Sequence, residues 1–398
     1  MSDQDAELGR KIALYRTRRG LSQREFAPMV GRSEAWVSQV ERGVRSVKSL
    51  GDIEKIAQVL NVSLAELAPT APKVVAMERP AESIPLRLLL SANYALRAAL
   101  GSAHRHDIAE LRAGADRAWV LAHESRYDEL VALLEVLLPR LETSSTGPNS
   151  TEVFALLARS YHACASSLAK LRQFDAAWVA ADRAISDAGR AGDPLLMAEG
   201  AFRLALVFLG ARQLDQAEHT ASTASQALES LVAQGVPEAL SVYGALTLQL
   251  AVIAAQTDRA DDARRFLDRA QEIASKLGGD RNDYHTEFGP TNVQLHEVAV
   301  AVDLGDAGEA IRRAEAVDAS KLSPERRGRL LIDVARAWTQ RRNVERALAA
   351  LEDAEAITPE QVHSHRLVRG LVNDLLRMAP ESEAARALSG RLRDDVLT

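Results

Sequence analysis

One short pattern recurs along residues 126–384 and limits what this chain can fold into. Each occurrence places a turn-forming stretch, often containing Asp, just before a small or apolar residue, as in Gln173-Phe-Asp-Ala-Ala177 and Gln213-Leu-Asp-Gln-Ala217. The residues that close the pattern lie 47, 40, 46, 47, 37 and 37 positions apart, and they are Leu130, Ala177, Ala217, Ala263, Ala310, Ala347 and Ala384. Recurrence at such a period predicts stacked helical hairpins.

The repeating unit is clearest near the end of the chain. Residues 330–338 form one expected helix, residues 341–346 a turn, and residues 347–354 a second helix. Small residues stand where two antiparallel helices must touch: Ala335 on the first, and Ala347 and Ala354 on the second. This unit is similar to the tetratricopeptide repeat, a helix hairpin of about 34 residues. We predict about seven such hairpins over residues 86–398, with an α-solenoid of irregular helix pairs as the alternative.

The composition favours helices and an intracellular protein. Of the 398 residues 47% are hydrophobic but only 4% aromatic, and Ala and Leu promote helices whereas strands are rich in β-branched and aromatic residues. No run approaches the roughly 20 apolar residues of a membrane span, and no secretory signal opens the chain. The lone Cys164 excludes an internal disulfide and a multi-thiolate zinc site. We therefore expect a soluble, all-α, cytoplasmic protein without a cofactor or metal.

Residues 1–68 read as a separate domain of five short helices. Helix-ending glycines follow the first three helices, and the second begins with a capping box in which Ser22 is the N-cap and Glu25 is the third helical residue. Pro28 lies inside the second helix and should kink or shorten it. The expected helices cover residues 5–19, 22–30, 34–42, 50–60 and 64–67.

Two short helices joined by a tight Gly-containing turn are the helix-turn-helix arrangement, whose second helix enters the major groove of DNA. The segments that carry this pattern are, in order, Leu8-Gly-Arg-Lys-Ile, Arg19-Gly-Leu-Ser-Gln-Arg-Glu-Phe-Ala, Trp36-Val-Ser-Gln-Val-Glu-Arg-Gly and Ile53-Glu-Lys-Ile-Ala. Residues 5–68 thus resemble the helix-turn-helix domain of phage-repressor (XRE) type. The resemblance implies a double-stranded DNA operator as partner and a homodimer that reads two half-sites.

The expected DNA contacts divide between base edges and phosphates. Gln39 could form a bidentate contact to adenine, and an Arg near the helix exit suits a phosphate, although each Arg could equally be a solvated surface charge. Trp36 is either a wedge on the DNA face or a partly packed surface residue. The candidates are Gln23, Arg24, Arg32, Glu34, Ala35, Trp36, Ser38, Gln39, Arg42, Arg45 and Lys48.

The net charge of -6 argues against a DNA-binding protein when it is taken over the whole chain. It is distributed unevenly between residues 1–68 and the remainder. Residues 1–68 carry 11 Lys and Arg against 9 Asp and Glu, whereas the remainder carries 38 against 46. Six basic residues crowd at the head of the small domain: Arg10, Lys11, Arg16, Arg18, Arg19 and Arg24. We therefore expect the small domain to touch DNA and the acidic remainder to stay away from it.

Residues 69–85 contain four prolines and predict an extended linker between the small domain (1–68) and the repeats (86–398). In a superhelix the first helices of the hairpins line a concave groove. Polar and aromatic residues at these positions either bind a ligand or merely solvate the superhelix. The candidates are Trp119, Arg159, His162, Phe202, Arg203, Gln249, Asn292, His296, Arg329 and Arg336.

The domain order resembles the peptide-sensing quorum regulators, and the Ala- and Arg-rich composition looks actinobacterial. The resemblance implies a transcriptional regulator whose groove binds a peptide, a small molecule or a partner protein, with Asn292, Arg203 and Arg329 as candidate peptide contacts. The alternative is a scaffold whose repeats bind a protein while the small domain tethers it to DNA. No catalytic motif is present, and His104/His106 and His363/His365 are spaced poorly for chelation. An enzyme is not expected.

Overall fold

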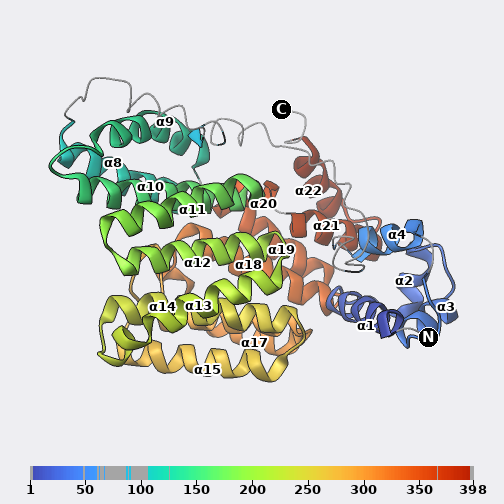
Figure 1. Cartoon of the computed structure of the whole chain (residues 1–398). Coiled ribbons are helices and arrows are strands. Elements are labelled where there is room, and N and C mark those ends of the chain that lie inside the picture. The colour runs from blue at the N-terminus through green and yellow to red at the C-terminus, as the bar shows by residue number, and fades with distance from the viewer. Residues whose placement is uncertain are drawn as a thin grey trace.

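The computed structural model describes residues 3–47, 50–60, 106–124, 126–364 and 366–394, together with residues 62, 67, 87, 89 and 90. The predicted linker, Lys48, His104, His365 and most of the fifth predicted helix lie outside these residues. The described part is helical and contains no strand, which confirms the predicted all-α class. Figure 1 shows a small N-terminal group of helices beside a long helical stack.

The small domain packs four described helices around one apolar core. Phe26 and Val37 are fully buried in it, and Ile12 and Ile56 are almost so. Pro28 stays inside the second helix, which ends one residue later. The helices are α1 (Asp3–Arg18), α2 (Gln23–Met29), α3 (Glu34–Glu41) and α4 (Leu50–Leu60).

Within the described residues the remainder forms seven helical hairpins, as the recurring pattern predicted. Consecutive first helices pack against one another along the stack, and each also packs against its own second helix. The first helices are α8 (Ile108–His123), α10 (Ser150–Lys170), α12 (Pro194–Gly210), α14 (Pro237–Gln256), α16 (Pro290–Asp303), α18 (Pro324–Gln340) and α21 (Arg366–Met378). The second helices are α9 (Tyr127–Ser144), α11 (Phe174–Ala191), α13 (Leu214–Ala233), α15 (Ala260–Leu277), α17 (Ala307–Ala316), α19 (Val344–Ile357) and α22 (Glu383–Asp394). Shorter helices are η1 (Asp283–His285), η2 (Ala319–Lys321) and α20 (Pro359–Ser364).

Five hairpins share one turn geometry. A residue with positive φ stands five positions before the closing alanine in each, at Arg172, Arg212, Asp258, Gly305 and Arg342. In each turn the next N–H bonds a carbonyl in the last turn of the first helix, as from Gln173 to Leu168 at 2.8 Å. This is the Schellman helix ending. The repeat is therefore a repeat of turn conformation as well as of small residues.

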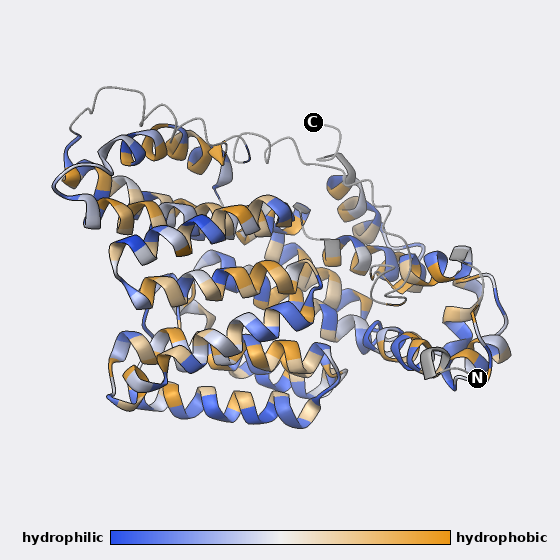
Figure 2. Cartoon of the chain, viewed as in Figure 1, coloured by the Kyte–Doolittle hydropathy of each residue, from blue (hydrophilic) through white to orange (hydrophobic). Residues whose placement is uncertain are grey.

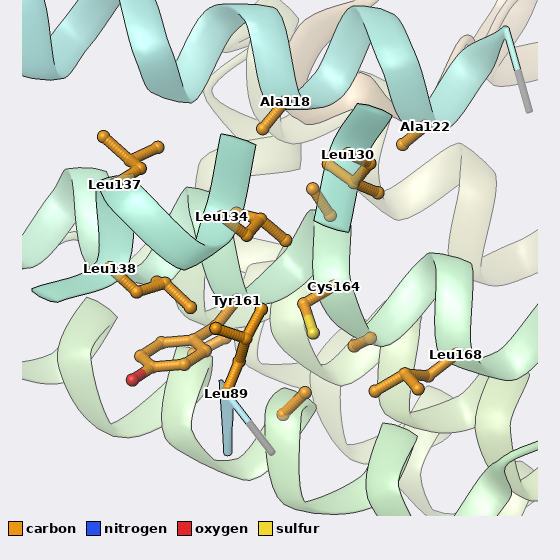
Figure 3. Packing of buried hydrophobic residues seen from close by; sticks show 14 of the residues in the cluster. Leu89, Ala118, Ala122, Leu130, Leu134, Leu137, Leu138, Tyr161, Cys164 and Leu168 are labelled. Carbon is orange, nitrogen blue, oxygen red and sulfur yellow. The ribbon is translucent and has the colours of Figure 1, made fainter. Parts of the chain in front are cut away.

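The closing residues are buried where the hairpins meet. Leu130, Ala177, Ala217, Ala263, Ala310 and Ala347 are completely buried. The seventh position is a correction, because Ala384 is exposed and its neighbour Ala385 is buried. Figure 3 shows the packing around Cys164, which is buried among leucines, as expected for a core residue. Burial raises the pKa of this thiol to about 12.

Helix α14 corrects the expectation that no helix is apolar enough to cross a membrane. Its residues 237–256 are long and apolar enough to cross a membrane, by length and composition alone. However, 89% of its most apolar stretch is buried inside the stack. Figure 2 shows that hydrophilic and apolar residues alternate along the outer helix α15. The apolar character of α14 reflects its place between hairpins, which is typical of a central core helix.

Candidate functional site

The helix-turn-helix geometry is set by two local caps. Ser22 Oγ accepts from Glu25 N at 3.2 Å while Glu25 returns a bond to Ser22 N, so the predicted capping box is present. Ser33 Oγ accepts from Trp36 N at 3.2 Å and starts α3. Gly31, with φ of 70°, turns the chain between the two helices.

A buried carboxylate fixes α3 against its neighbours. Glu41 accepts from Arg16 of α1 at 2.5 and 2.9 Å, and from the Gln23 amide of α2 at 2.7 Å. Because one side chain on α3 bonds to both α1 and α2, it sets the orientation of α3 against these two helices. Gln23 was predicted near a phosphate; its amide nitrogen is engaged by Glu41 here.

Most predicted DNA contacts form an accessible surface. Ser38 and Gln39 are half-buried on α3, while Arg32 also pairs with Asp52 of α4 at 2.5 Å. Trp36 is only 8% exposed and packs in the core with the Arg32 guanidinium 5.3 Å from its ring centre, so it is more buried than either predicted alternative, a DNA-face wedge or a partly packed surface residue. The exposed candidates are Arg24, Arg32, Glu34, Ala35, Arg42 and Arg45.

The basic cluster at the head of the chain has a different use from the one predicted. Arg16 bonds the buried Glu41 carboxylate, and Lys11 forms a surface ion pair with Glu7. Arg18 donates to the carbonyls of Ala255 and Gln256 at the end of α14, the latter at 3.1 Å. Its positive charge is suited to the negative end of a helix dipole.

The same end of α1 joins the small domain to the repeats. Arg19 Nε donates to the Asp374 carboxylate of α21 at 2.8 Å, and Gln340 Nε2 of α18 donates to Arg18 O at 2.8 Å. Glu25 pairs with Arg342; although burial raises its pKa, bonds from Arg342 and Ser22 outweigh this and lower the pKa to about 2. Helix α3 lies on the side of the small domain away from the stack (Figure 1).

Several predicted groove residues instead link consecutive first helices. They contact polar groups of the neighbouring helix because these faces of the helices meet each other, although His162 Nε2 and Gln249 Oε1 are buried without a hydrogen-bond partner in the described part of the chain. His162 Nδ1 lies 3.1 Å from Glu199 Oε2, and Gln249 Nε2 donates to Phe202 O at 3.1 Å. Arg159 pairs with Asp116 at 2.5 Å, and Arg336 with Asp303 at 2.5 Å. These contacts therefore join neighbouring first helices, and the predicted role in a groove stays a prediction.

Trp119 and Arg203 meet at a loop that crosses the concave side of the stack. We call residues 279–289, between α15 and α16, the insert. The His285 ring of the insert stacks on Trp119 with centroids 4.3 Å apart and planes 13° apart. Arg203 Nη2 donates to His285 O at 2.7 Å, and its guanidinium lies 4.7 Å from the Trp119 ring centre. The sequence did not single out this loop as part of the site.

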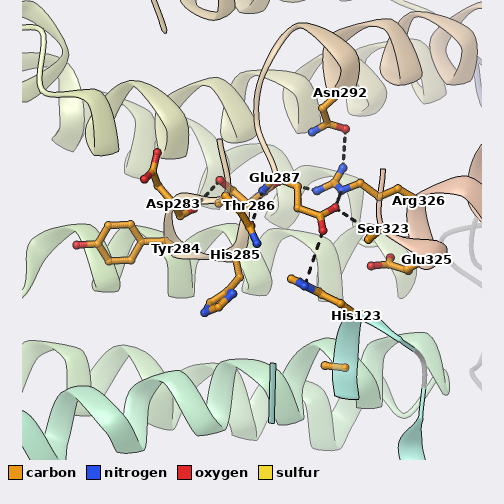
Figure 4. Close-up of polar contacts among 12 residues, drawn as sticks. His123, Asp283, Tyr284, His285, Thr286, Glu287, Asn292, Ser323, Glu325 and Arg326 are labelled. Carbon is orange, nitrogen blue, oxygen red and sulfur yellow. Dashed lines mark hydrogen bonds and ion pairs between the residues drawn. The ribbon is translucent and has the colours of Figure 1, made fainter. Parts of the chain in front are cut away.

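The opposite end of the insert meets α18 (Figure 4). Arg326 binds the Glu287 carboxylate and donates to Thr286 O at 2.6 Å and to Asn292 Oδ1 at 2.5 Å. Ser323 Oγ also donates to Glu287, at 3.0 Å. Asn292 is therefore engaged inside the protein rather than presented to solvent.

The insert lies in a low-dielectric setting that keeps histidines neutral. Burial lowers the pKa of His123 to about 4 and that of His285 to about 3. Across the concave side, Lys170 of α10 pairs with Glu325 of α18 at 3.1 Å. Burial raises the pKa of Glu325, but Lys170 and Arg326 outweigh it and lower this pKa to about 2. The charged contact thus persists at neutral pH and joins distant hairpins.

A small hollow remains between α16 and α18. Asn292, His296 and Arg329, all predicted groove residues, lie along it with Arg326 and Asp333. The free space is about 20 Å³, which suits a water molecule rather than a peptide. Burial lowers the pKa of His296 to about 3, so this wall is uncharged at that residue near neutral pH.

Comparisons with known proteins cover the small domain. A family described as "Helix-turn-helix domain" matches residues 7–69. The chain is 40% identical over 60 residues to the HTH-type transcriptional regulator SlrR of Bacillus subtilis (strain 168), and 41% identical over 66 residues to the uncharacterized HTH-type transcriptional regulator YazB of the same organism. These alignments cover 15% and 16% of this chain, 40% of SlrR and 94% of YazB.

The fold of residues 3–60 and these matches define a helix-turn-helix DNA-binding protein. The chain belongs to the family of HTH-type transcriptional regulators. It spans less than half of SlrR, and the matches do not extend into the repeats.

Proposed function

We propose that this regulator reads an operator with α3 and adjusts that binding according to what occupies its helical repeats. The observation that carries the first part is an accessible α3, capped by Ser33 and fixed by Glu41, with Gln39 and Arg42 on its surface. Helix-turn-helix domains of this size read two half-sites as dimers, so a homodimer is part of the proposal. A cytoplasmic location follows from that function.

The second part rests on the stack and its contact with the small domain. Superhelical stacks of hairpins bind ligands on the concave side, and the tetratricopeptide type fits the hairpins here. Arg18, Arg19 and Glu25 bond to the repeats, so a change in the stack reaches the DNA-reading domain directly. A peptide, a small molecule or a partner protein remains the proposed class of signal, with the tethered scaffold as the alternative.

The DNA-reading roles separate by specificity. We expect Gln39→Ala to relax preference at one base pair by about 1–3 kcal/mol, because a direct base contact is lost. Arg42→Ala should weaken binding evenly across sequences and reduce the salt slope by about one, because a phosphate contact is lost. Operator selection from a random duplex pool, followed by titration at several salt concentrations, measures both.

The matched control is Val44→Ala, an exposed residue two positions beyond Arg42. It should leave both preference and salt slope unchanged. Equal loss on all sequences for Gln39→Ala would contradict a base-reading role. The scaffold alternative is favoured if operator affinity does not respond to occupation of the repeats.

A further inference from the structure

The insert is unusually long for a connection in this stack. It lies between Leu277 and Pro290, whereas two residues join α11 to α12 and three join α13 to α14. Hairpins stack without such a length, and long ordered loops in compact domains usually carry function. The extra chain runs across the concave side and contacts the first helices of several other hairpins (Figure 4).

The receiving residues come from helices far apart in sequence. Trp119 of α8 stacks on the His285 ring. Arg203 of α12 donates to the backbone carbonyl of His285, and Arg326 of α18 donates to the carbonyl of Thr286. Arg203 is buried, with its Nε atom lacking a hydrogen-bond partner among the described residues, and the same is true of Trp119 Nε1. Buried donors left unused at a site are unfavourable, and a ligand that reaches them gains from bonding them.

The Glu287 carboxylate completes the set. It is bound by Arg326 and Ser323, and its Oε1 lies 3.7 Å from His123 Nδ1. The insert thus presents an aromatic ring, two backbone carbonyls and, two residues after the ring, a carboxylate. Extended peptides are recognised through the same groups: main-chain bonds for affinity and side-chain pockets for specificity.

The backbone of this segment is not the one its residues prefer. Tyr284, His285 and Glu287 have φ values of 49°, 54° and 48°, in the left-handed region that non-glycine residues rarely adopt. Such conformations persist when surrounding contacts impose them. The segment has turn bonds of its own, from His285 N to Asn282 O at 3.3 Å and from Thr286 N to Asp283 O at 3.1 Å. The receiving residues add bonds from helices outside the insert, so both sets of contacts hold the segment.

We propose that residues 284–287 are a built-in occupant of a peptide-binding site on the concave side, and that the ligand is an acidic peptide which displaces them. The site recognises a ring two residues before a carboxylate, through Trp119, Arg203 and Arg326. This proposal rests on the proposed sensing function and names its ligand class. Free protein is self-occupied, and the signal competes with the insert.

The test uses a variant of the full chain in which the insert no longer occupies the site. The same segment is then added as a separate peptide. The open variant carries Tyr284→Gly, His285→Gly, Thr286→Ser and Glu287→Gly, which remove the stacked ring and the bound carboxylate that occupy the site. It keeps Asp280, which caps α16 by accepting from Thr291 N at 2.9 Å, and the buried anchor Phe288. The probe is the end-blocked peptide Asn-Asp-Tyr-His-Thr-Glu-Phe, the sequence of residues 282–288.

We expect the open variant to bind this peptide at least about tenfold more tightly than the wild type, because self-occupation lowers apparent affinity by the fraction of open sites. Isothermal titration calorimetry measures both affinities. A peptide with Gln in place of its Glu should bind the open variant more weakly, as should the wild-type peptide when Arg326→Ala is added. A matched variant in the exposed α9–α10 connection, Thr146→Gly with Pro148→Gly, should behave as wild type.

A folded open variant that does not bind the peptide, or a wild type that binds it equally well, would overturn the proposal and leave the insert a structural brace. If the open variant does not fold, Gly244→Ala replaces it. A Cβ at Gly244 would overlap the Phe288 ring, so this change loosens the insert from one anchor. Failure of Gly244→Ala to raise peptide affinity would have the same meaning.

Two readouts keep this proposal apart from the sensing function. Peptide affinity needs no DNA, so it tests self-occupation alone. Operator affinity of the open variant, with and without peptide, tests sensing alone. Tight peptide binding with unchanged operator affinity supports the built-in occupant and contradicts sensing, whereas an operator response to groove variants without peptide binding contradicts the occupant only.

Discussion

The helix-turn-helix domain and the repeats differ in how far apart in the sequence the residues lie whose contacts fix their structure. In the small domain Ser22 bonds Glu25 three residues away, and Ser33 bonds the backbone of Trp36 three residues away. In the repeats Trp119 stacks on His285, and Lys170 pairs with Glu325, across more than 150 residues. Helix caps between near neighbours can be recognised in a sequence. Which residues line the concave surface depends on how the whole superhelix is assembled.

The largest expected effect tests whether the two regions are separable. Phe26→Ala removes a fully buried ring from the small core and should cost about 3–5 kcal/mol, enough to unfold that domain. We expect DNA binding to disappear while most helicity remains, because the hairpins have their own cores. Circular dichroism during urea unfolding, alongside a duplex-binding assay, measures this.

The exposed Val44→Ala is the control for that prediction and should change neither signal. Loss of nearly all helicity in Phe26→Ala would mean that the contacts of Arg18 and Arg19 make one cooperative unit of the two regions. The small domain and the repeats would then not be separable folding units.

Acid should act on the repeats through their buried histidines, since residues 1–68 contain none. Burial lowers the pKa of His285 to about 3. Below pH 6.5 this imidazole is therefore protonated in the unfolded chain but stays neutral in the folded chain. Stability is therefore lost as pH falls from about 6.5 towards 3. By pH 5.5 this residue alone costs about 1.4 kcal/mol.

His285→Phe keeps a ring on Trp119 but cannot titrate. We expect the difference in unfolding free energy between pH 7.5 and 5.5 to shrink by about 1.4 kcal/mol, measured by urea unfolding at both pH values. His219→Gln, at an exposed residue, is the control and should leave the difference unchanged. An unaltered difference in His285→Phe would show that His285 already titrates normally in the folded chain.

Sequence patterns predicted the all-α class, the hairpin turns and the small buried residues, because each depends on neighbours within one hairpin. They placed the seventh buried alanine one residue early, at Ala384 rather than Ala385. The basic cluster has contacts that charge alone does not predict. Charge density predicts attraction to DNA, but only the assembled chain shows that Arg18 binds the end of α14 and Arg19 pairs with Asp374 of α21.

The predicted groove residues all lie on the first helices of the hairpins. Gln249 and Arg336 lie on first helices, but their side chains bond between neighbouring helices. The insert carried a signal that could have been used: Tyr284 and Phe288 lie close together in a chain with only 4% aromatic residues, between Gly279 and Pro290. What they contact, Asp193 before α12 and Gly244 of α14, depends on how separate hairpins stack, which no local pattern encodes.

The smallest expected effect concerns a local contact in the small domain, the N-cap of α2. Ser22→Ala removes the N-cap of α2 and should cost the small domain about 1 kcal/mol. Ser22→Thr should restore most of this, because its hydroxyl can accept the same N–H bond. Thermal unfolding followed by loss of duplex binding measures both variants. An equal loss in both would show that the side chain acts through Glu25 and its partner Arg342, and that even this cap belongs to the long-range contacts between the two regions.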